Sequence, residues 1–445
     1  MLNLNERIRA SPYYPALVHP VFRRVLPGAA ASALGDGMSA VAIAWLALKL
    51  APADTRGLWV GAAVAAYTLP GAVGAIVLRR WLHGRPGTGL VIVNAVLRTT
   101  ALGLAGCLAL AGLLGPPAYV ALLGVSSLLT AWGVAGKYTL IADLFPADQR
   151  VAGNTVFSLA DQLSLMIGPA LAGVIAALVG PAIVIVLDAA SWALLAVSYA
   201  GAARFLRAAH TAQPPPEAPS QEPPPPGTPP AATSAPSPAP PGGWALIRSV
   251  PVLGGLLALT FVFYLLYGPL EVALPVHVAL DLHGSAALLG LYWAVFGVGA
   301  IGGELSAPYL RRWPVWPVMT GIVLAWGLAL LPLGLPAPLW AGLAAFFAGG
   351  LIFGPWMSLS MGVFQDASPP GTLAEVLAAR SSLLILAAPI GIAFGGPLVA
   401  ALGARGTLLA SALATIALGL ITTAVLARAR ARTRAQARAS AQVRA

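Results

Sequence analysis

Long apolar runs constrain the fold of this chain more than any other feature. A helix needs roughly 20 mostly apolar residues to cross a bilayer. About twelve such runs follow one another, about six on each side of a proline-rich segment. They cover residues 21–50, 58–78, 89–114, 118–141, 155–179 and 182–203, then 252–278, 285–310, 315–333, 339–362, 376–402 and 407–426. The sequence therefore predicts an all-α, polytopic membrane protein with twelve transmembrane helices.

The composition excludes an ordinary soluble domain. Of the 445 residues, 58% are hydrophobic and 9% are charged, whereas soluble domains carry about 25% charged residues. Too little polar surface would remain to cover a core of that size. The net charge of +11 does not indicate nucleic-acid binding, because the arginines lie in short loops and in the C-terminal tail without interleaved aromatic residues.

The proline-rich segment, residues 213–243, divides the chain into two halves. Proline fixes φ and removes a backbone donor, and the segment has few bulky apolar residues to bury. We therefore predict an extended cytoplasmic linker there. The domains we predict are a cytoplasmic N-terminal segment (1–20), an N-terminal six-helix half (21–205), the Pro-rich linker (206–250), a C-terminal six-helix half (251–427) and a basic cytoplasmic tail (428–445).

The two halves repeat each other in sequence. Leu78-Arg79-Arg80-Trp81 recurs as Leu310-Arg311-Arg312-Trp313, a shift of 232 (310 − 78). Later in each half the shift is 223, which places Asp143 on Asp366, Gly173 on Gly396 and Gly180 on Gly403. Duplicated halves are typical of secondary transporters. The repeat predicts two pseudo-symmetric six-helix bundles.

Basic residues predict the orientation in the membrane. With the N-terminus inside, almost all arginines fall in cytoplasmic loops or in the tail, and the outside loops hold Lys49, Arg56 and Arg405. Because short cytoplasmic loops carry the excess of Lys and Arg, we expect both termini and the linker to be cytoplasmic. The protein would then be a multi-pass protein of the plasma (inner) membrane.

Ionisable residues inside the apolar runs are the first candidates for function, because each costs at least ~2.5–3.5 kcal/mol at the bilayer centre. Asp36 lies in mid-helix between Gly35 and Gly37. A carboxyl group that can be desolvated suits proton uptake and release. The alternative is an acid paired with a lysine or arginine that only holds helices together.

The other ionisable candidates are Glu271, Asp161, Asp188 and Arg98. Pro269 and Pro275 bracket Glu271, which predicts a broken helix of the kind that forms binding or gating segments. Asp161 and Asp188 lie about seven residues inside one end of their helices, so simple contact with water is an alternative for both. For Arg98 we expect an inward-facing position as counter-ion to one of these acids.

A second group of residues is predicted to control conformation. Gly168-Pro169 with Gly173 would kink a helix and let another helix cross closely. Charges in the inner loops could form a weak latch between the halves. This group consists of Arg79, Arg80, Asp143 and Arg150, with Arg311, Arg312 and Asp366 from the second half.

Nothing in the sequence indicates an enzyme, a metal site or a bound cofactor. The five histidines are scattered, the single cysteine, Cys107, lies in an apolar run, and no phosphate-binding loop pattern is present. The expected partners are a small-molecule substrate, protons and membrane lipids, with no nucleic acid, and we expect a monomer.

Several motifs resemble the major facilitator superfamily over nearly the whole chain, and most of all its bacterial efflux branch, which includes macrolide exporters and the enterobactin exporter. These motifs are Gly35-Asp36 with Ala44-Trp45-Leu46, Asp143-Leu-Phe-Pro leading to Asn154, Ile167-Gly168-Pro169 with Gly173, and Asp188-Ala-Ala-Ser-Trp192. The loop after Gly74 departs from the family pattern, since it lacks the aspartate and the second glycine. The arginine typical of the fourth helix of drug exporters is also missing.

The resemblance implies that the first helix lines a central cavity and that Gly168, Pro169 and Gly173 form the motif of drug–proton exchangers. The implied function is proton-coupled export of a hydrophobic or amphipathic small molecule (a drug, natural product or siderophore) by alternating access. Two alternatives stay open at this point. One is a lipid or lysolipid flippase without proton coupling, and the other is a non-transporting membrane scaffold or sensor.

Overall fold

The computed structural model describes residues 14–78, 85–212, 243–368 and 372–444, and in these ranges it contains helices and no strands. The first half consists of α2 (Tyr14–Val18), α3 (Pro20–Leu50), η1 (Ala53–Thr55), α4 (Arg56–Val77), α6 (Gly87–Leu110), α7 (Pro116–Ser127), α8 (Thr130–Leu144), α9 (Ala147–Val179) and α10 (Pro181–Ala212). The second half consists of α11 (Gly243–Ser249), α12 (Pro251–Val276), η2 (His277–Asp281), α13 (Ala286–Glu304), α14 (Ala307–Leu310), α15 (Val315–Gly334), α16 (Leu339–Phe353), α17 (Trp356–Ala367) and α18 (Leu373–Arg444). The all-α prediction is confirmed for the described residues.

The described helices fit the twelve predicted membrane spans. Ten stretches of the described chain are long and apolar enough to cross a bilayer. One of the ten, Ala379–Ala429, contains two helices, because Gly403 has non-helical angles (φ 70°, ψ 173°). The apolar helix α4 adds another 22 residues. The chain is therefore an integral, multi-pass membrane protein.

The predicted repeat is visible in the backbone. Gly180, which follows α9, has φ 95°, and Gly403, at the joint inside α18, has φ 70°. Both values lie in the left-handed region, which a residue without a Cβ enters at little cost. The two positions differ by the shift of 223 found in the sequence (403 − 180). Gly180 and Gly403 are therefore equivalent positions, and each joins the fifth and sixth spans of its half.

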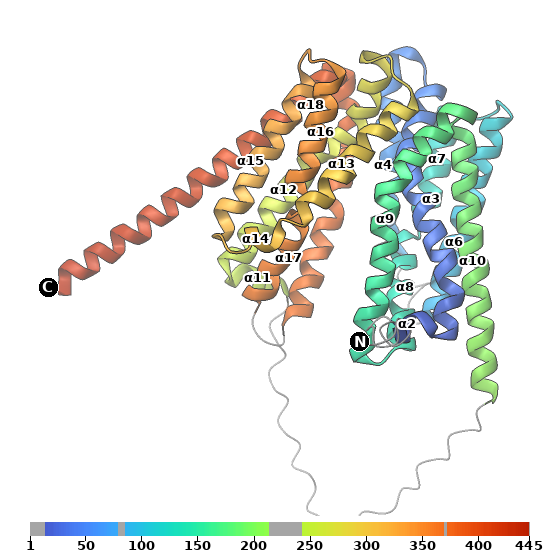
Figure 1. The fold of residues 1–445 in the computed structure, drawn as a ribbon, viewed down its shortest axis with the longest axis horizontal. Coiled ribbons are helices and arrows are strands. Elements are labelled where there is room, and N and C mark those ends of the chain that lie inside the picture. Colours follow the sequence, from blue (N-terminus) through green and yellow to red (C-terminus); the bar gives the residue numbers. More distant parts are fainter. Residues whose placement is uncertain (1–13, 79–84, 213–242, 369–371, 445) are drawn as a thin grey trace, which may run out of the picture.

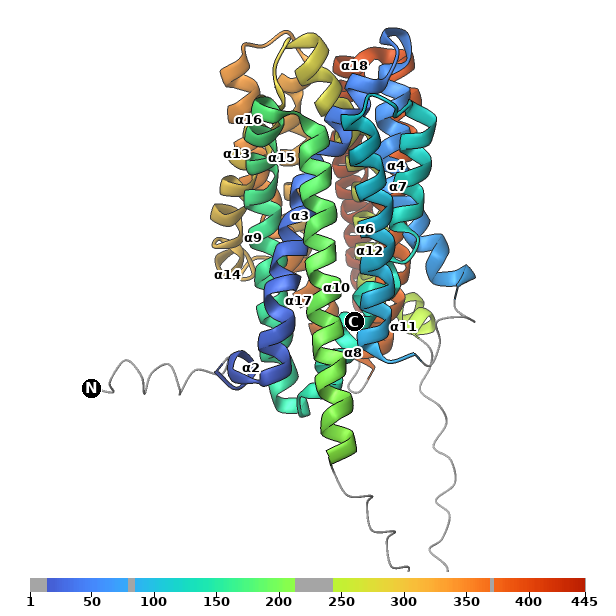
Figure 2. The ribbon, with the colours of Figure 1, turned by 90° about the vertical axis from the view of Figure 1, so that its right-hand side faces the viewer.

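The two halves meet at one end of the molecule and lie apart at the other (Figure 1). At the closed end, α9 packs against α13 and α4 packs against α18. Glycines allow both contacts, since a Cβ on Gly61 would lie 2.6 Å from the Cα of Gly396, and one on Gly173 would lie 3.0 Å from the Cα of Gly290. The separated ends lie on the side of α2 and of the two helix ends that flank residues 213–242 (Figures 1 and 2).

Three helices differ from the sequence prediction. The fourth span of each half is interrupted, between α7 and α8 and again between α16 and α17, where Gly354-Pro355 breaks the second of them. Conversely, the predicted break around Glu271 is wrong. Helix α12 continues through Pro269 and Pro275 and then widens into a π-helical turn, His277–Asp281. Proline is tolerated inside membrane helices because neighbouring helices and local helix adjustments satisfy the backbone groups that it frees.

Candidate functional site

Two glycines place Asp36 at the meeting point of three helices. A Cβ on Gly35 would collide with Ser191 and Asp188 of α10, and one on Gly37 would collide with the backbone of Ser164 in α9. Without these side chains, α9 and α10 approach α3 closely on either side of the acid. Asp36 is thereby directed into a cavity inside the first half.

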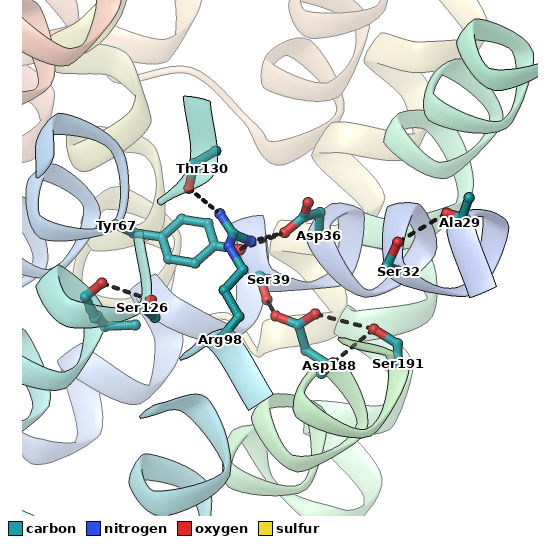
Figure 3. Close-up of polar contacts among 11 residues, drawn as sticks. Ala29, Ser32, Asp36, Ser39, Tyr67, Arg98, Ser126, Thr130, Asp188 and Ser191 are labelled. Atoms are coloured by element: carbon teal, nitrogen blue, oxygen red, sulfur yellow. Dashed lines mark hydrogen bonds and ion pairs between the residues drawn. The ribbon is translucent and has the colours of Figure 1, made fainter. Parts of the chain in front are cut away.

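Asp36 forms an ion pair with Arg98 of α6 (Figure 3). The Nη1 of Arg98 lies 2.6 Å from Oδ1 of Asp36, and the hydroxyl of Tyr67 in α4 donates to the same oxygen at 2.6 Å. Arg98 also donates to the Tyr67 oxygen at 3.0 Å and, through Nη2, to Oγ1 of Thr130 at 3.0 Å. The predicted counter-ion and the predicted mid-helix acid are therefore partners.

The two members of this pair differ in their contact with solvent. The side chain of Arg98 is 3% exposed, whereas that of Asp36 is 41% exposed. The guanidinium is covered by the ring of Trp192 at 4.4 Å and by that of Tyr67 at 5.0 Å. Cation–π contacts of this kind strengthen when the cation is desolvated. The arginine is thus held in place on several sides, and the carboxylate remains open to the cavity.

Asp188 does not reach water, contrary to the alternative that its position near a helix end suggested. Its side chain is fully buried. It accepts a hydrogen bond from Ser39, which lies one turn after Asp36 on α3, and contacts Ser191 of its own helix at 3.5 Å. Close packing at Gly35 explains the burial. Helix α3 therefore links the two acids, because Asp36 and Ser39, the donor to Asp188, lie one turn apart on it (Figure 3).

A second ion pair, absent from the sequence prediction, links Lys137 of α8 to Asp161 of α9. The Nζ of Lys137 lies 2.9 Å from Oδ2 of Asp161, and the two side chains are 19% and 50% exposed. Lys137 also faces the ring of Phe157 at 5.2 Å. A signal for Lys137 did exist, because it is the lone charged residue inside the apolar run 118–141. The reasoning that selected Asp36 applies to it equally.

Both ion pairs border one cavity of about 320 Å³, which lies at the low end of the usual size range for ligand sites. Its walls come from α3, α6, α8, α9 and α10, with apolar side chains between the polar ones. The polar and aromatic lining residues include Ser32, Asp36, Asn94, Thr130, Lys137, Asp161, Trp192 and Tyr199. Such a cavity can hold a small amphipathic molecule and offer it both charges.

Glu271 lies outside this cavity, in α12 of the other half. It is partly buried, and its polar neighbour is Tyr267, one turn earlier in the helix. The structure therefore does not bring all the predicted acids together. Asp36 and Asp161 line the cavity and Asp188 lies behind it, whereas Glu271 belongs to the second bundle.

The predicted glycine–proline motif lies where α9 crosses two other helices. A Cβ on Gly168 would lie 2.5 Å from the carbonyl carbon of Gly37, so this glycine packs α9 onto α3. Pro169 lies inside the helix, and its carbonyl faces Gly290 of α13. Gly173 packs against α13 as well. The motif therefore takes part in two helix contacts: α9 with α3 inside the first half, and α9 with α13 between the halves.

The predicted latch is only partly within the described residues. Arg79 and Arg80 lie outside them, the side chain of Arg150 is not described either, and Asp143 is exposed. In the second half, Arg311 lies 2.9 Å from Asp366 with both side chains 65% exposed, and Arg312 lies near the ring of Tyr309. The Arg311–Asp366 pair joins elements of one half. A latch between the halves stays a prediction.

Comparisons with known proteins agree on the class of this chain. The sequence profile of the Major Facilitator Superfamily matches residues 25–383. The multidrug efflux pump Tap of Mycobacterium tuberculosis is 26% identical over 402 residues, which cover 88% of this chain and 90% of Tap. The uncharacterized MFS-type transporter y4rN of Sinorhizobium fredii is 28% identical over 307 residues, which cover 67% of this chain and 69% of y4rN.

Solved structures share the fold at low sequence identity. A bacterial homologue of the human lysosomal transporter Spinster, in an inward-facing and unoccupied conformation, superimposes with a TM-score of 0.66 at 13% identity and covers 91% of this chain and 95% of its own. A bacterial homologue of the iron transporter ferroportin, in an inward-facing state, gives 0.65 at 15% identity and covers 91% and 99%.

Proposed function

Because the chain belongs to the major facilitator superfamily and is a membrane transporter, we propose that it is a secondary active exporter of a hydrophobic or amphipathic small molecule, driven by proton antiport. Among the relatives, Tap carries the description of a multidrug efflux pump. This supports export as the direction of transport and a drug-like compound as the cargo. The plasma membrane of a bacterium is the proposed location.

The observation that carries proton coupling is the unequal exposure of the Arg98–Asp36 pair. Asp36 faces the cavity, where a proton can reach it, and Arg98 is buried behind it. Protonation of Asp36 would leave a buried guanidinium without its counter-charge, and breaking a buried pair in this way costs about 3–5 kcal/mol. Arg98 must then find another anion. Asp188 lies close enough to act on it electrostatically.

Alternating access follows from how the halves are joined. In the orientation that the basic residues predict, the separated ends face the cytoplasm and the glycine contacts close the outer end. Substrate would enter from the inside and bind next to Asp36. A change in the pairing of Arg98 alters contacts among α3, α4, α6 and α8 together. These are the elements that must reorient if the first half is to rock against the second.

The test is transport into proteoliposomes under an imposed pH gradient, with wild-type protein and the Asp36→Asn variant. A panel of fluorescent lipophilic dyes supplies the substrate, and entrapped pyranine reports proton movement. Asn resembles the protonated acid in shape, so we expect the variant to fold and to lose uphill transport with its proton flux. Asp54→Asn, at an exposed residue of η1, is the matched control. Wild-type accumulation by Asp36→Asn would assign Asp36 a structural role.

A further inference from the structure

Arg380, near the start of α18, is a buried cation, and one edge of its guanidinium has no hydrogen-bonding partner in the part of the chain that the structure describes. Its side chain is 5% exposed. Its Nε and Nη2 are buried, and neither has a hydrogen-bond partner among the described residues. The ring of Phe364 in α17, 5.2 Å from the guanidinium carbon, compensates the charge in part. A guanidinium buried without a counter-charge is strongly unfavourable. A bound anion would therefore stabilise this side chain.

The unpaired edge has the geometry of a receptor for two oxygens. Nε and Nη2 present parallel N–H bonds along one side of the planar group, and that edge matches a carboxylate or a phosphate. On α17, Ser360 lies one turn before Phe364, and its buried hydroxyl has no hydrogen-bond partner in the described chain either. It could donate to the same anion. Among the acids of this half whose side chains are described, Asp281 is engaged with His277, Glu304 with Ser358 and Asp366 with Arg311. No ion pair joins the remaining one, Glu271, to Arg380 in this part of the chain.

An aromatic surface lies beside this cation. We call it the aromatic wall and define it as Tyr264, Tyr267, Phe296 and Phe353, all of which are half-buried. The ring of Phe353 lies 6.5 Å from that of Tyr264, 6.3 Å from that of Tyr267 and 6.0 Å from that of Phe296. Arg380 and Tyr264 lie close enough to interact electrostatically, which places the cation at the Tyr264 end of the wall. The hydroxyl of Tyr264, at the near end of the wall, donates to the exposed Met357 at 3.0 Å.

We propose that Arg380 binds the carboxylate or phosphate group of an amphipathic compound whose aromatic or apolar body lies along the aromatic wall. This inference deepens the proposed function and rests on it, because it names an acidic amphipath as one class of cargo. It also assigns different roles to the two halves. The first half carries the paired charges of Asp36, Arg98, Lys137 and Asp161, and the second half carries an unpaired cation beside aromatic rings.

The test compares three naphthalene probes on the purified full-length protein in phosphatidylcholine nanodiscs. The probes are 1-naphthylacetate, the uncharged 1-naphthaleneethanol and 1-naphthylethylammonium, with dissociation constants measured by isothermal titration calorimetry. We expect the acid to bind at least about tenfold more tightly than the alcohol, as one charge-assisted bidentate pair would give, and the ammonium compound to bind most weakly. Equal affinities of acid and alcohol for the wild type would overturn the proposal without any variant.

Three variants localise the effect. Arg380→Gln should abolish the preference for the acid, and Arg380→Lys should keep part of it, because an ammonium group supplies the charge without the two parallel donors. Arg311→Gln, at an exposed arginine of the same half, should behave like the wild type. An unchanged preference in Arg380→Gln contradicts the proposal. Loss of acid binding in discs that contain phosphatidylglycerol would assign the site to a lipid headgroup instead of a substrate. Binding does not depend on a pH gradient, so it can succeed or fail independently of the transport assay with Asp36→Asn.

Discussion

The Nη1 of Arg98 lies 2.6 Å from Oδ1 of Asp36, and the same nitrogen lies 3.0 Å from the hydroxyl oxygen of Tyr67. Three residues from three helices therefore share one small set of hydrogen bonds. The hydrogen bonds of such a network strengthen one another, so the loss of one charge weakens the contacts among all three helices. The proposed role of Asp36 in proton coupling is therefore compatible with a structural role, because the same carboxylate links three helices.

The Arg98–Asp36 pair predicts unequal effects of single and double substitutions. Asp36→Asn should destabilise the protein by about 3–5 kcal/mol, because it leaves the buried guanidinium of Arg98 without its counter-charge. The double variant Arg98→Gln with Asp36→Asn should recover part of that loss, since neither charge is left alone. Thermal unfolding of the purified proteins in detergent measures both effects. A double variant less stable than either single variant would show that the pair does not act as a unit.

The Lys137–Asp161 pair should behave differently, because it is much more exposed. Exposed ion pairs contribute about 0–1 kcal/mol, so we expect Lys137→Gln to change stability by less than about 1 kcal/mol. Its effect should appear in substrate affinity, since Lys137 lines the cavity. Thermal unfolding and dye binding on the same preparation separate the two quantities. A large loss of stability with unchanged dye binding would make this lysine structural.

Ser39 is predicted to be necessary for the burial of Asp188. Its hydroxyl donates to the carboxylate of Asp188, which is fully buried. Without this donor the buried carboxylate loses a hydrogen bond that offsets its desolvation, which costs about 1–3 kcal/mol, or more for a charged group. Ser39→Ala should therefore lower the melting temperature clearly. Ser249→Ala, at an exposed serine that ends α11, provides the control. Equal melting temperatures for the two variants would mean that Asp188 does not depend on this donor.

The glycine contacts at the closed end predict that a bulky residue there separates the halves. Gly61→Leu has no space, since its Cβ alone would lie 2.6 Å from the Cα of Gly396. Val399, 7% exposed and packed on Gly57, is the reporter. In a Cys107→Ser background, Val399→Cys should react faster with a bulky maleimide when Gly61→Leu is present.

The control for the Gly61→Leu variant is Gly201→Leu, because no neighbouring atom lies within 4 Å of the Cβ position of Gly201. Labelling of Val399→Cys should be the same in this control as without any glycine substitution. If Gly61→Leu also leaves labelling unchanged in a folded protein, the α4–α18 contact does not keep the halves closed at this end.

The sequence was sufficient for the class of fold but not for the partners of its charged residues. The length of an apolar run is a local property, so all-α spans and their repeat were predictable. Which acid Arg98 would contact was not, because Asp36 and Arg98 are separated by 62 positions and meet only through helix packing. The burial of Asp188 was not predictable for the same reason, and the alternative that it reaches water is wrong. Its burial depends on the absence of a side chain at Gly35, on another helix.

Two other errors concern local structure. Pro269 and Pro275 predicted a broken helix, but α12 continues, because neighbouring helices can satisfy the backbone groups that a proline frees in a membrane bundle. Lys137 was overlooked although the rule that selected Asp36 covers it. The unpaired edge of Arg380 could not be found from sequence at all, since it is defined by the lack of a contact.

The two glycine contacts between the halves, Gly61 with Gly396 and Gly173 with Gly290, also limit how the molecule can move. They lie on different helix pairs at the same end of the bundle. Neither contact has room for a Cβ, so the halves cannot slide past each other there without separating. Rotation about the line through the two contacts keeps both of them closed. We therefore expect the halves to move relative to each other mainly by a hinge rotation at this end.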